Sequence, residues 1–175
     1  LPRPAAQVAA EVQDFLTQRV RIALEDRNLR YDVVDAVLAV LPDYPSQAYR
    51  RAELIARLRK EPFFADMLQA LIRVGNLARQ AGDNDPQLEL FSEPAEKELY
   101  QHYLGLKDNI PQLLDQERGQ EALEQLSTLA QPVDRFFTDV LVMAEDPAVR
   151  SNRLALLRAV RDLAFSLADF SRLVP

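Results

Sequence analysis

The sequence predicts an all-α fold, a helical bundle of seven to eight mostly antiparallel helices. Ala, Leu, Arg, Glu and Gln, which favour helices, dominate its 175 residues, whereas Gly occurs only four times. Apolar residues recur at three- and four-residue intervals, which is the period of a helix face. The eleven prolines stand mostly where such segments would begin or end. Short connections favour antiparallel neighbours, and the length suits a single domain over 1–175.

The first predicted helix covers about residues 5–28. Its apolar residues share one face: Val8, Val12, Phe15, Leu16, Val20, Ala23 and Leu24. A short second helix over 33–40 is apolar on most sides and should be deeply buried, with Asp32 as its cap and Pro42 after its end.

Later boundaries follow from Pro, Gly and capping residues. Helices are expected over about 47–60 and 62–81, the second ending at a left-handed cap on Gly82. A polar loop over 83–91 follows. A long helix over 94–116 should break near Asn109, because a proline lies inside it. The last three helices should cover about 120–129, 132–143 and 147–173, with Asp146 capping the final one.

Composition excludes several classes of function. There is no Cys and only one His, His102, so a zinc site is not expected. No signal peptide or apolar run of membrane-spanning length stands out, which favours a cytoplasmic protein. The net charge of −6 argues against strong nonspecific binding to nucleic acid, although a local basic face remains compatible with it. No phosphate-binding glycine loop or hydrolase motif is present, so no catalytic residues are assigned.

Four segments resemble, in order, the β subunit of bacterial glycyl-tRNA synthetase. Residues 132–157 contain P-V-D-R-F-F-T-D-V-L-V-M-A-E-D and R-S-N-R-L-A-L-L, where the family typically has P-V-D-x-F-F-D-x-V-M-V-M-A-x-D and R-x-N-R-L-A-L-L. Residues 30–39 read R-Y-D-V-V-D-A-V-L-A, as in the family. Residues 73–79 are similar to its R-I-x-N-I-x-K, and residues 90–100 resemble its L-F-x-E-P-A-E-K-x-L-Y. The match is loose over about 42–64, and Thr138, Leu141 and Phe170 differ from the residues usual in the family.

The resemblance implies a DALR-type anticodon-binding helical domain, similar to that of arginyl-tRNA synthetase. In the family, an α subunit activates glycine with ATP and Mg²⁺, and the β subunit recognises tRNA. The implied partners are the anticodon arm of glycine tRNA, the remainder of the β subunit and the α subunit, with no DNA or membrane. The chain lacks an initiator Met and would be a fragment of a longer β subunit. It would hold no cofactor or metal and would do no catalysis alone.

Two groups of residues are candidates for tRNA binding. Arg73, Asn76 and Arg79 recur every three residues, hence on one side of a helix, and combine planar donors with an amide. On the final predicted helix, Arg150, Arg158 and Arg161 fall within an arc of about 80° beside the apolar face. They could follow phosphates or stack on anticodon bases. The alternatives are a polar helix contact for Asn76 and a salt-bridged surface for the second group.

Other polar residues are given structural interpretations. The acidic residues Asp134, Asp139, Glu145 and Asp146 would repel RNA, so we expect one of them, Asp139 in particular, to form a buried pair with Arg153 between the last two helices. Tyr44 and Tyr49 are weaker candidates for stacking platforms. His102 is expected to be an ordinary surface or packing residue.

Two other functions remain open. The domain could be a structural module that docks within the synthetase and contacts RNA little, in which case an exposed apolar patch is expected. Alternatively, the chain could share only the helical fold and serve as a protein-interaction bundle.

Overall fold

A computed structural model describes residues 4–40 and 45–175, and all regular structure in these ranges is helical. The all-α prediction is therefore confirmed for this part of the chain. The structure divides it more finely than expected, into nine α-helices and two short 3₁₀ helices: α1 (Ala5–Glu25), α2 (Tyr31–Leu38), α3 (Pro45–Leu58), α4 (Pro62–Ala78), η1 (Leu88–Leu90), α5 (Pro94–Leu106), α6 (Asn109–Asp115), α7 (Gly119–Ser127), α8 (Ala130–Asp139), α9 (Pro147–Phe165) and η2 (Phe170–Arg172).

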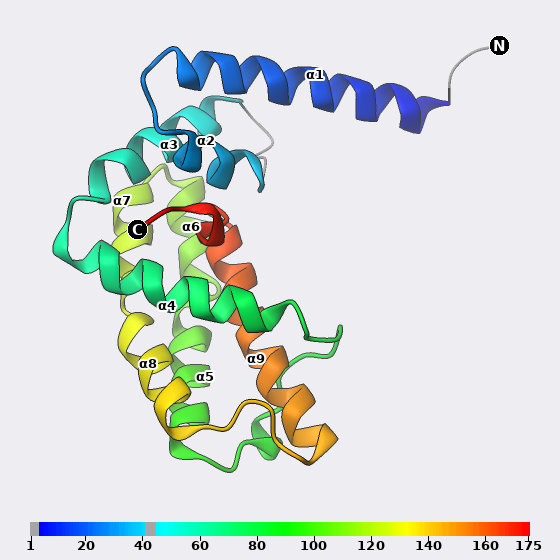
Figure 1. Cartoon of the computed structure of the whole chain (residues 1–175), viewed down its shortest axis with the longest axis vertical. Helices are drawn as coiled ribbons and strands as arrows, with labels where there is room; N and C mark the ends of the chain where they lie inside the picture. Colours follow the sequence, from blue (N-terminus) through cyan, green and yellow to red (C-terminus); the bar gives the residue numbers. More distant parts are fainter. Residues whose placement is uncertain (1–3, 41–44) are drawn as a thin grey trace.

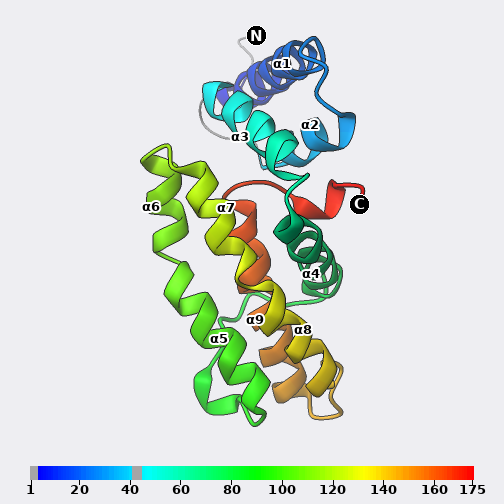
Figure 2. The same ribbon diagram turned by 90° about the vertical axis from the view of Figure 1, so that its left-hand side faces the viewer.

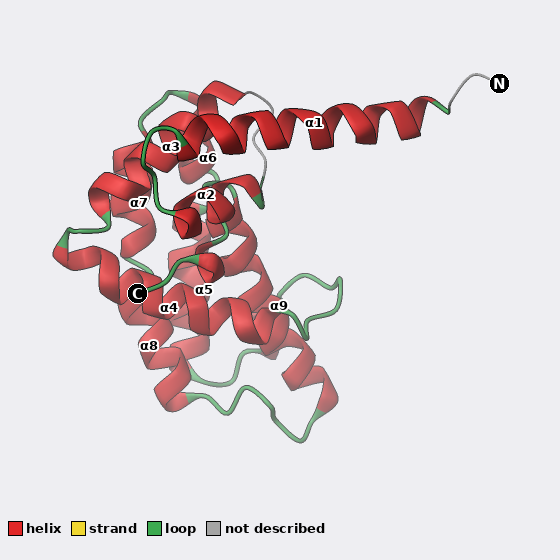
Figure 3. Ribbon diagram, turned by 45° about the horizontal axis from the view of Figure 1, so that its top comes forward, coloured by secondary structure: helices red, strands yellow, loops and turns green. Residues whose placement is uncertain are grey.

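The helices from α4 onward form the main bundle. In Figure 2, α5 and α6 run upward, α7 and α8 return downward, and α9 runs upward again, so the expected antiparallel arrangement is present here. Helix α4 lies across this set, as Figure 1 shows, and packs on both α8 and α9. Helices α1, α2 and α3 form a second layer at one end of the bundle, and α1 projects beyond it (Figures 1 and 3). The 3₁₀ helix η2 brings the end of the chain against α2 and α4.

Several predicted boundaries are confirmed, and the reasons are local. The expected break near Asn109 separates α5 from α6. Asp146 caps α9, because one carboxylate oxygen accepts hydrogen bonds from the backbone N–H groups of Ala148 and Val149, at 2.8 and 3.3 Å. After α1, Asn28 adopts a left-handed conformation with φ of 57°, which Asn tolerates better than most residues.

Other boundaries were predicted wrongly. Helix α9 ends at Phe165, because the chain turns there and residues 170–172 form η2 instead of continuing the helix. Gly82 is not a left-handed cap, since no glycine in the described ranges has a positive φ. Pro42, expected to follow the second helix, lies outside the described residues.

Asp32 is not the cap of α2, because the helix begins one residue before it. Its side chain is fully buried and accepts hydrogen bonds from the backbone N–H of Val174 at 3.0 Å and from Arg30 Nε and Nη2, both at 3.1 Å. Arg59 Nη1 lies 3.4 Å from the same carboxylate, and Arg59 Nη2 donates to the carbonyl of Val174 at 2.9 Å. Asp32 therefore fastens the end of the chain to α2 and α3.

Arg153 is buried as expected, but its partner is not Asp139. Its Nε donates to Glu96 Oε1 at 2.6 Å, and its Nη1 donates to the carbonyl of Leu141 at 2.8 Å. Asp139 is exposed at the end of α8. Glu96 lies in the first turn of α5, where its other oxygen accepts from the backbone N–H of Glu93 at 2.7 Å. The buried pair therefore links α9 to α5 instead of linking the last two helices to each other.

Candidate nucleic-acid interface

The exposed side of α4 carries the first group of candidate residues. Arg73, Asn76 and Arg79 are all exposed, at or next to the carboxyl-terminal half of the helix. Arg73 Nη1 is 3.0 Å from Asp134 Oδ1, and its guanidinium carbon lies 4.4 Å from the centre of the Phe137 ring. Arg73 is therefore held towards α8. The side chains of Asn76 and Arg79 make no hydrogen bond or ion pair with any residue in the described ranges.

Arg79 and Arg161 meet at one small cavity between α4, α9 and η2. The cavity measures about 60 Å³ and is lined also by Phe165 and Phe170, so it is too small to enclose a base. Arg161 donates from Nη2 to Asp162 Oδ1 at 2.6 Å, and its guanidinium carbon lies 5.3 Å from the centre of the Phe165 ring. The rim thus combines two guanidinium groups with an aromatic ring and the carboxylate of Asp169. Guanidinium and aromatic groups are the side chains on which splayed bases stack.

Arg158 and Arg150 do not extend this surface, because hydrogen bonds and ion pairs within the chain occupy their guanidinium groups. Arg158 is largely buried, with 19% of its side chain exposed, and donates to the carbonyl of Asn84 at 3.1 Å. Its guanidinium also lies 3.4 Å from Asp83 and 3.7 Å from Asp85. Arg158 therefore anchors the loop after α4. Arg150 Nη1 donates to the carbonyl of Ala144 at 3.0 Å, before the start of α9.

The loop after α4 has a second anchor that sequence reasoning did not select. Asn152 is buried on α9, where its Oδ1 accepts from the backbone N–H of Gln87 at 2.7 Å and its Nδ2 donates to the carbonyl of the same residue at 2.9 Å. This two-point contact resembles a strand pairing made by a side chain. It fixes the loop beside the candidate surface, together with Arg158.

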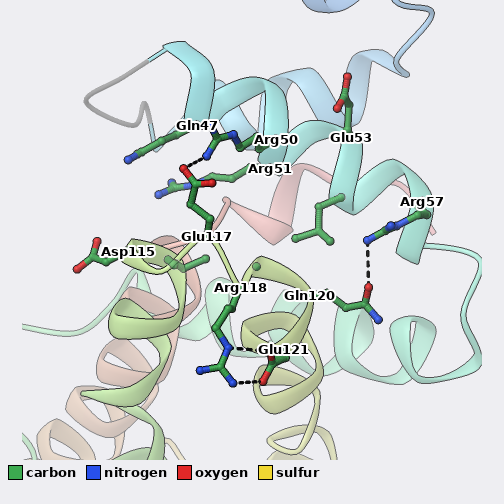
Figure 4. A pocket seen from close by; sticks show the side chains of 13 residues that line it. Gln47, Arg50, Arg51, Glu53, Arg57, Asp115, Glu117, Arg118, Gln120 and Glu121 are labelled. Atoms are coloured by element: carbon green, nitrogen blue, oxygen red, sulfur yellow. Dashed lines mark hydrogen bonds and ion pairs between the residues drawn. The ribbon is translucent and has the colours of Figure 1, made fainter.

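A larger arginine-lined cleft lies between α3 and α7 (Figure 4). It measures about 560 Å³, and Arg50, Arg51, Arg57 and Arg118 line it together with four carboxylates, those of Glu53, Asp115, Glu117 and Glu121. Arg50 forms an ion pair with Glu117, and Arg118 pairs with Glu121 through both ends of its guanidinium, at 2.8 and 2.5 Å. The lining therefore carries no net charge. Asn76 and Arg79 at the end of α4 and Arg161 on α9 form the α4–α9 surface, where only Arg161 is paired within the described ranges, with Asp162. A polyanion would therefore displace fewer internal ion pairs there than in the cleft, which makes the cleft the poorer RNA site.

The remaining candidates occupy ordinary positions. Tyr49 is half-buried under Arg27, whose guanidinium carbon lies 4.8 Å from the ring centre, and Tyr44 lies outside the described residues. His102 is exposed on α5. Within residues 4–40 and 45–175, no group of three or more His, Cys, Asp or Glu side chains is placed to hold a metal ion. None of the helices there is long and apolar enough to cross a membrane.

The class of protein that fits is a helical RNA-binding domain, because this all-α bundle exposes two guanidinium groups and an amide along α4 and places the partly buried Arg161 of α9 beside them. Residues 67–168, more than half of the chain, match the DALR anticodon binding domain family, and the chain belongs to this family. The matched range includes α5 to α9 and most of α4, and hence all six arginine and asparagine residues proposed for tRNA binding, but not η2.

Individual relatives share a more specific name than the family description. The chain is 42% identical over 168 residues to the glycine–tRNA ligase beta subunit of Desulforudis audaxviator, covering 96% of this chain and 24% of that protein. It is 41% identical over 176 residues to that of Moorella thermoacetica, covering 100% of this chain and 25% of the relative. With the protein of the same name from Edwardsiella ictaluri it shares 38% identity over 169 residues. The chain thus spans about a quarter of the length of these relatives.

Proposed function

We propose that this chain is the anticodon-binding domain of a longer glycyl-tRNA synthetase β subunit and binds the anticodon arm of glycine tRNA. The observation that carries the proposal is the exposed edge of α4, where Asn76 and Arg79 have no partner in the described ranges and Arg79 shares a cavity with Arg161. Unpaired donors suit unstacked bases, because Asn76 and Arg79 lose no ion pair with the described residues on binding, whereas Arg161 is already paired with Asp162. The membership of the DALR anticodon binding domain family supports the same function.

In this proposal the domain contributes recognition only. Glycine activation, with ATP and Mg²⁺, takes place elsewhere in the enzyme, and the partners of the domain are the remainder of the β subunit and the α subunit. The setting is cytoplasmic, where tRNA is charged. The net charge of −6 fits this role if the acidic excess lies away from the α4–α9 surface, because it then discourages nonspecific RNA binding.

The test is a titration of the chain with glycine tRNA and with the same tRNA carrying a replaced anticodon, at low and moderate salt. Replacing Arg79 with Ala should weaken binding of glycine tRNA by about 1–3 kcal/mol, which is about 5- to 150-fold, if Arg79 contacts a base. The salt dependence should change little in that case. A uniform loss with all RNAs and a shallower salt slope would instead mean that Arg79 contacts a phosphate.

The matched control is Arg118→Ala, which removes the same charge at the α3–α7 cleft. We expect it to leave tRNA binding unchanged, because Arg118 is fully paired with Glu121. Loss of binding in Arg118→Ala but not in Arg79→Ala would move the RNA to the cleft and contradict the proposed surface. Equal binding of both tRNAs by the unaltered chain would contradict anticodon recognition.

A structural docking module is the second candidate function. The observation that favours it is the uncovered apolar face of α1, which the bundle does not bury. The two functions are compatible, because α1 and the α4–α9 surface are separate parts of the molecule (Figure 1).

A further inference from the structure

Helix α1 exposes large apolar side chains that the other described residues do not cover. Only Val20 and Leu24, near its carboxyl-terminal end, are buried against the second layer. The other large apolar residues are between 43% and 61% exposed: Val8, Val12, Phe15, Leu16 and Ile22. Figures 1 and 3 show the reason, since the amino-terminal half of α1 projects beyond the other helices.

These exposed side chains form one continuous face. At 100° per residue, the five lie within an arc of about 120°, and the arc continues directly into the positions of Val20 and Leu24. The spacing from Val8 to Val12 to Phe15, and then to Ile22, is the pattern with which amphipathic helices enter apolar grooves. The fold therefore buries only the edge of this apolar face that holds Val20 and Leu24 and leaves the remainder exposed to solvent.

The amino-terminal half of α1 also lacks support as an isolated helix. It has no side-chain cap and no acidic residue in its first turn, and a free helix of its length is marginal in water. Tertiary packing normally supplies the missing stability. A partner that buries Phe15 and its neighbours would supply it here.

From this, and given the proposed function, we propose that α1 is a docking helix whose apolar face packs into an apolar groove on the part of the β subunit that lies outside this chain. The DALR family match begins at residue 67, so α1 lies outside that family unit. The alignment with the Moorella relative nevertheless covers all of this chain, α1 included, while leaving three quarters of the relative unmatched. The helix thus belongs to the glycine–tRNA ligase context, which contains a large further surface.

The positive charge of Arg19 on α1 predicts that the groove also contains an acidic residue. Arg19 lies within the apolar arc and forms no ion pair with the described residues. Burying it beside apolar groups without an acceptor would be unfavourable, so the groove must present a carboxylate to it.

The experiment is hydrogen exchange on two proteins. One is the chain alone, and the other is the Moorella subunit with its matched quarter replaced by this chain. We expect peptides from residues 5–16 to exchange rapidly in the chain alone and at least about tenfold more slowly in the chimera, because docking adds to the free energy of local opening. Phe15→Glu in the chimera should abolish this slowing and leave exchange in α4 to α9 unchanged.

Ala10→Glu is the matched control, since it adds the same charge on the opposite, exposed side of α1. It should leave the slowing intact. Rapid exchange of residues 5–16 in the unaltered chimera would overturn the proposal. If the chimera fails to fold, exchange can be compared instead between the natural Moorella subunit and its isolated matching quarter, at the segment aligned with residues 5–16.

Two further outcomes would also overturn it. If the chain alone dimerises and Phe15→Glu returns it to a monomer, the occupant is a second copy. If glycine tRNA alone protects residues 5–16 in the isolated chain, the occupant is RNA. Unchanged tRNA affinity of Phe15→Glu in the isolated chain is expected, so a failure of docking can be told apart from a failure of anticodon binding.

Discussion

Replacing Glu96 with Gln should lower the free energy of unfolding by about 3–5 kcal/mol, which is a large part of the stability of a domain. Gln keeps the shape of the side chain but removes the charge that neutralises Arg153, which is 8% exposed. The carbonyl of Leu141 remains as an acceptor, yet it cannot replace a carboxylate at 2.6 Å. Urea denaturation of the chain, followed by circular dichroism, measures the loss.

Glu98→Gln is the matched control on the same helix. Glu98 pairs with Arg135 at 3.1 Å, but the pair is partly exposed to solvent, with 34% and 56% of the two side chains accessible. Its loss should lower stability by less than about 1 kcal/mol. Equal losses in the two variants would show that burial does not determine the strength of the Glu96–Arg153 pair.

The segments that resemble the family are those that contain the buried polar residues. Four polar or charged residues are buried in the described ranges: Asp32, Glu96, Asn152 and Arg153. All four lie inside segments that carry the resemblance, namely 30–39, 90–100 and 132–157. A buried polar group requires specific partners, whereas an apolar position accepts several residues of similar size. The most recognisable parts of the sequence are therefore structural, and they do not by themselves locate the RNA surface.

Local patterns predicted the elements better than their contacts. The cap at Asp146 and the break before Asn109 depend on neighbouring residues, and both are confirmed. The partner of Arg153 lies 57 residues away in the sequence, so charge alone could not choose Glu96 over the nearer carboxylates. The exposure of the apolar face of α1 could not be predicted from the sequence either. Helical periodicity indicates which residues share a face, but it does not indicate whether another part of the protein packs on that face.

The candidate surface shows the same limit. Spacing placed Arg73, Asn76 and Arg79 on one exposed side of α4, as the structure has them. It could not foresee that the loop after α4 folds back and occupies Arg158, or that Arg79 meets Arg161 across two packed helices. Their roles in tRNA binding stay predictions.

The second large effect is expected at Asp32. Replacing it with Asn should lower the free energy of unfolding at neutral pH by about 2–3 kcal/mol, because the partly buried donors on Val174 and Arg59 lose a fully buried, charged acceptor. Asp35→Asn is the matched control on the same helix. Asp35 pairs with Arg21 at 2.7 Å but is more exposed, so its loss should be no more than about 1 kcal/mol.

The pH dependence of this difference tests its cause. Burial raises the pKa of Asp32, but hydrogen bonds from Val174 and Arg30 and the charges of Arg59 and Arg30 outweigh it and hold the pKa below the ordinary value of 3.8. A lowered pKa in the folded state means that ionised Asp32 stabilises the fold fully above the unfolded-state value, and that this stabilisation is lost as the pH falls through the folded-state value. The stability difference between the unaltered chain and Asp32→Asn should therefore be constant from about pH 7 to 5 and shrink below about pH 4. A difference that grows on acidification would contradict the role of the carboxylate charge in fastening the end of the chain to α2 and α3.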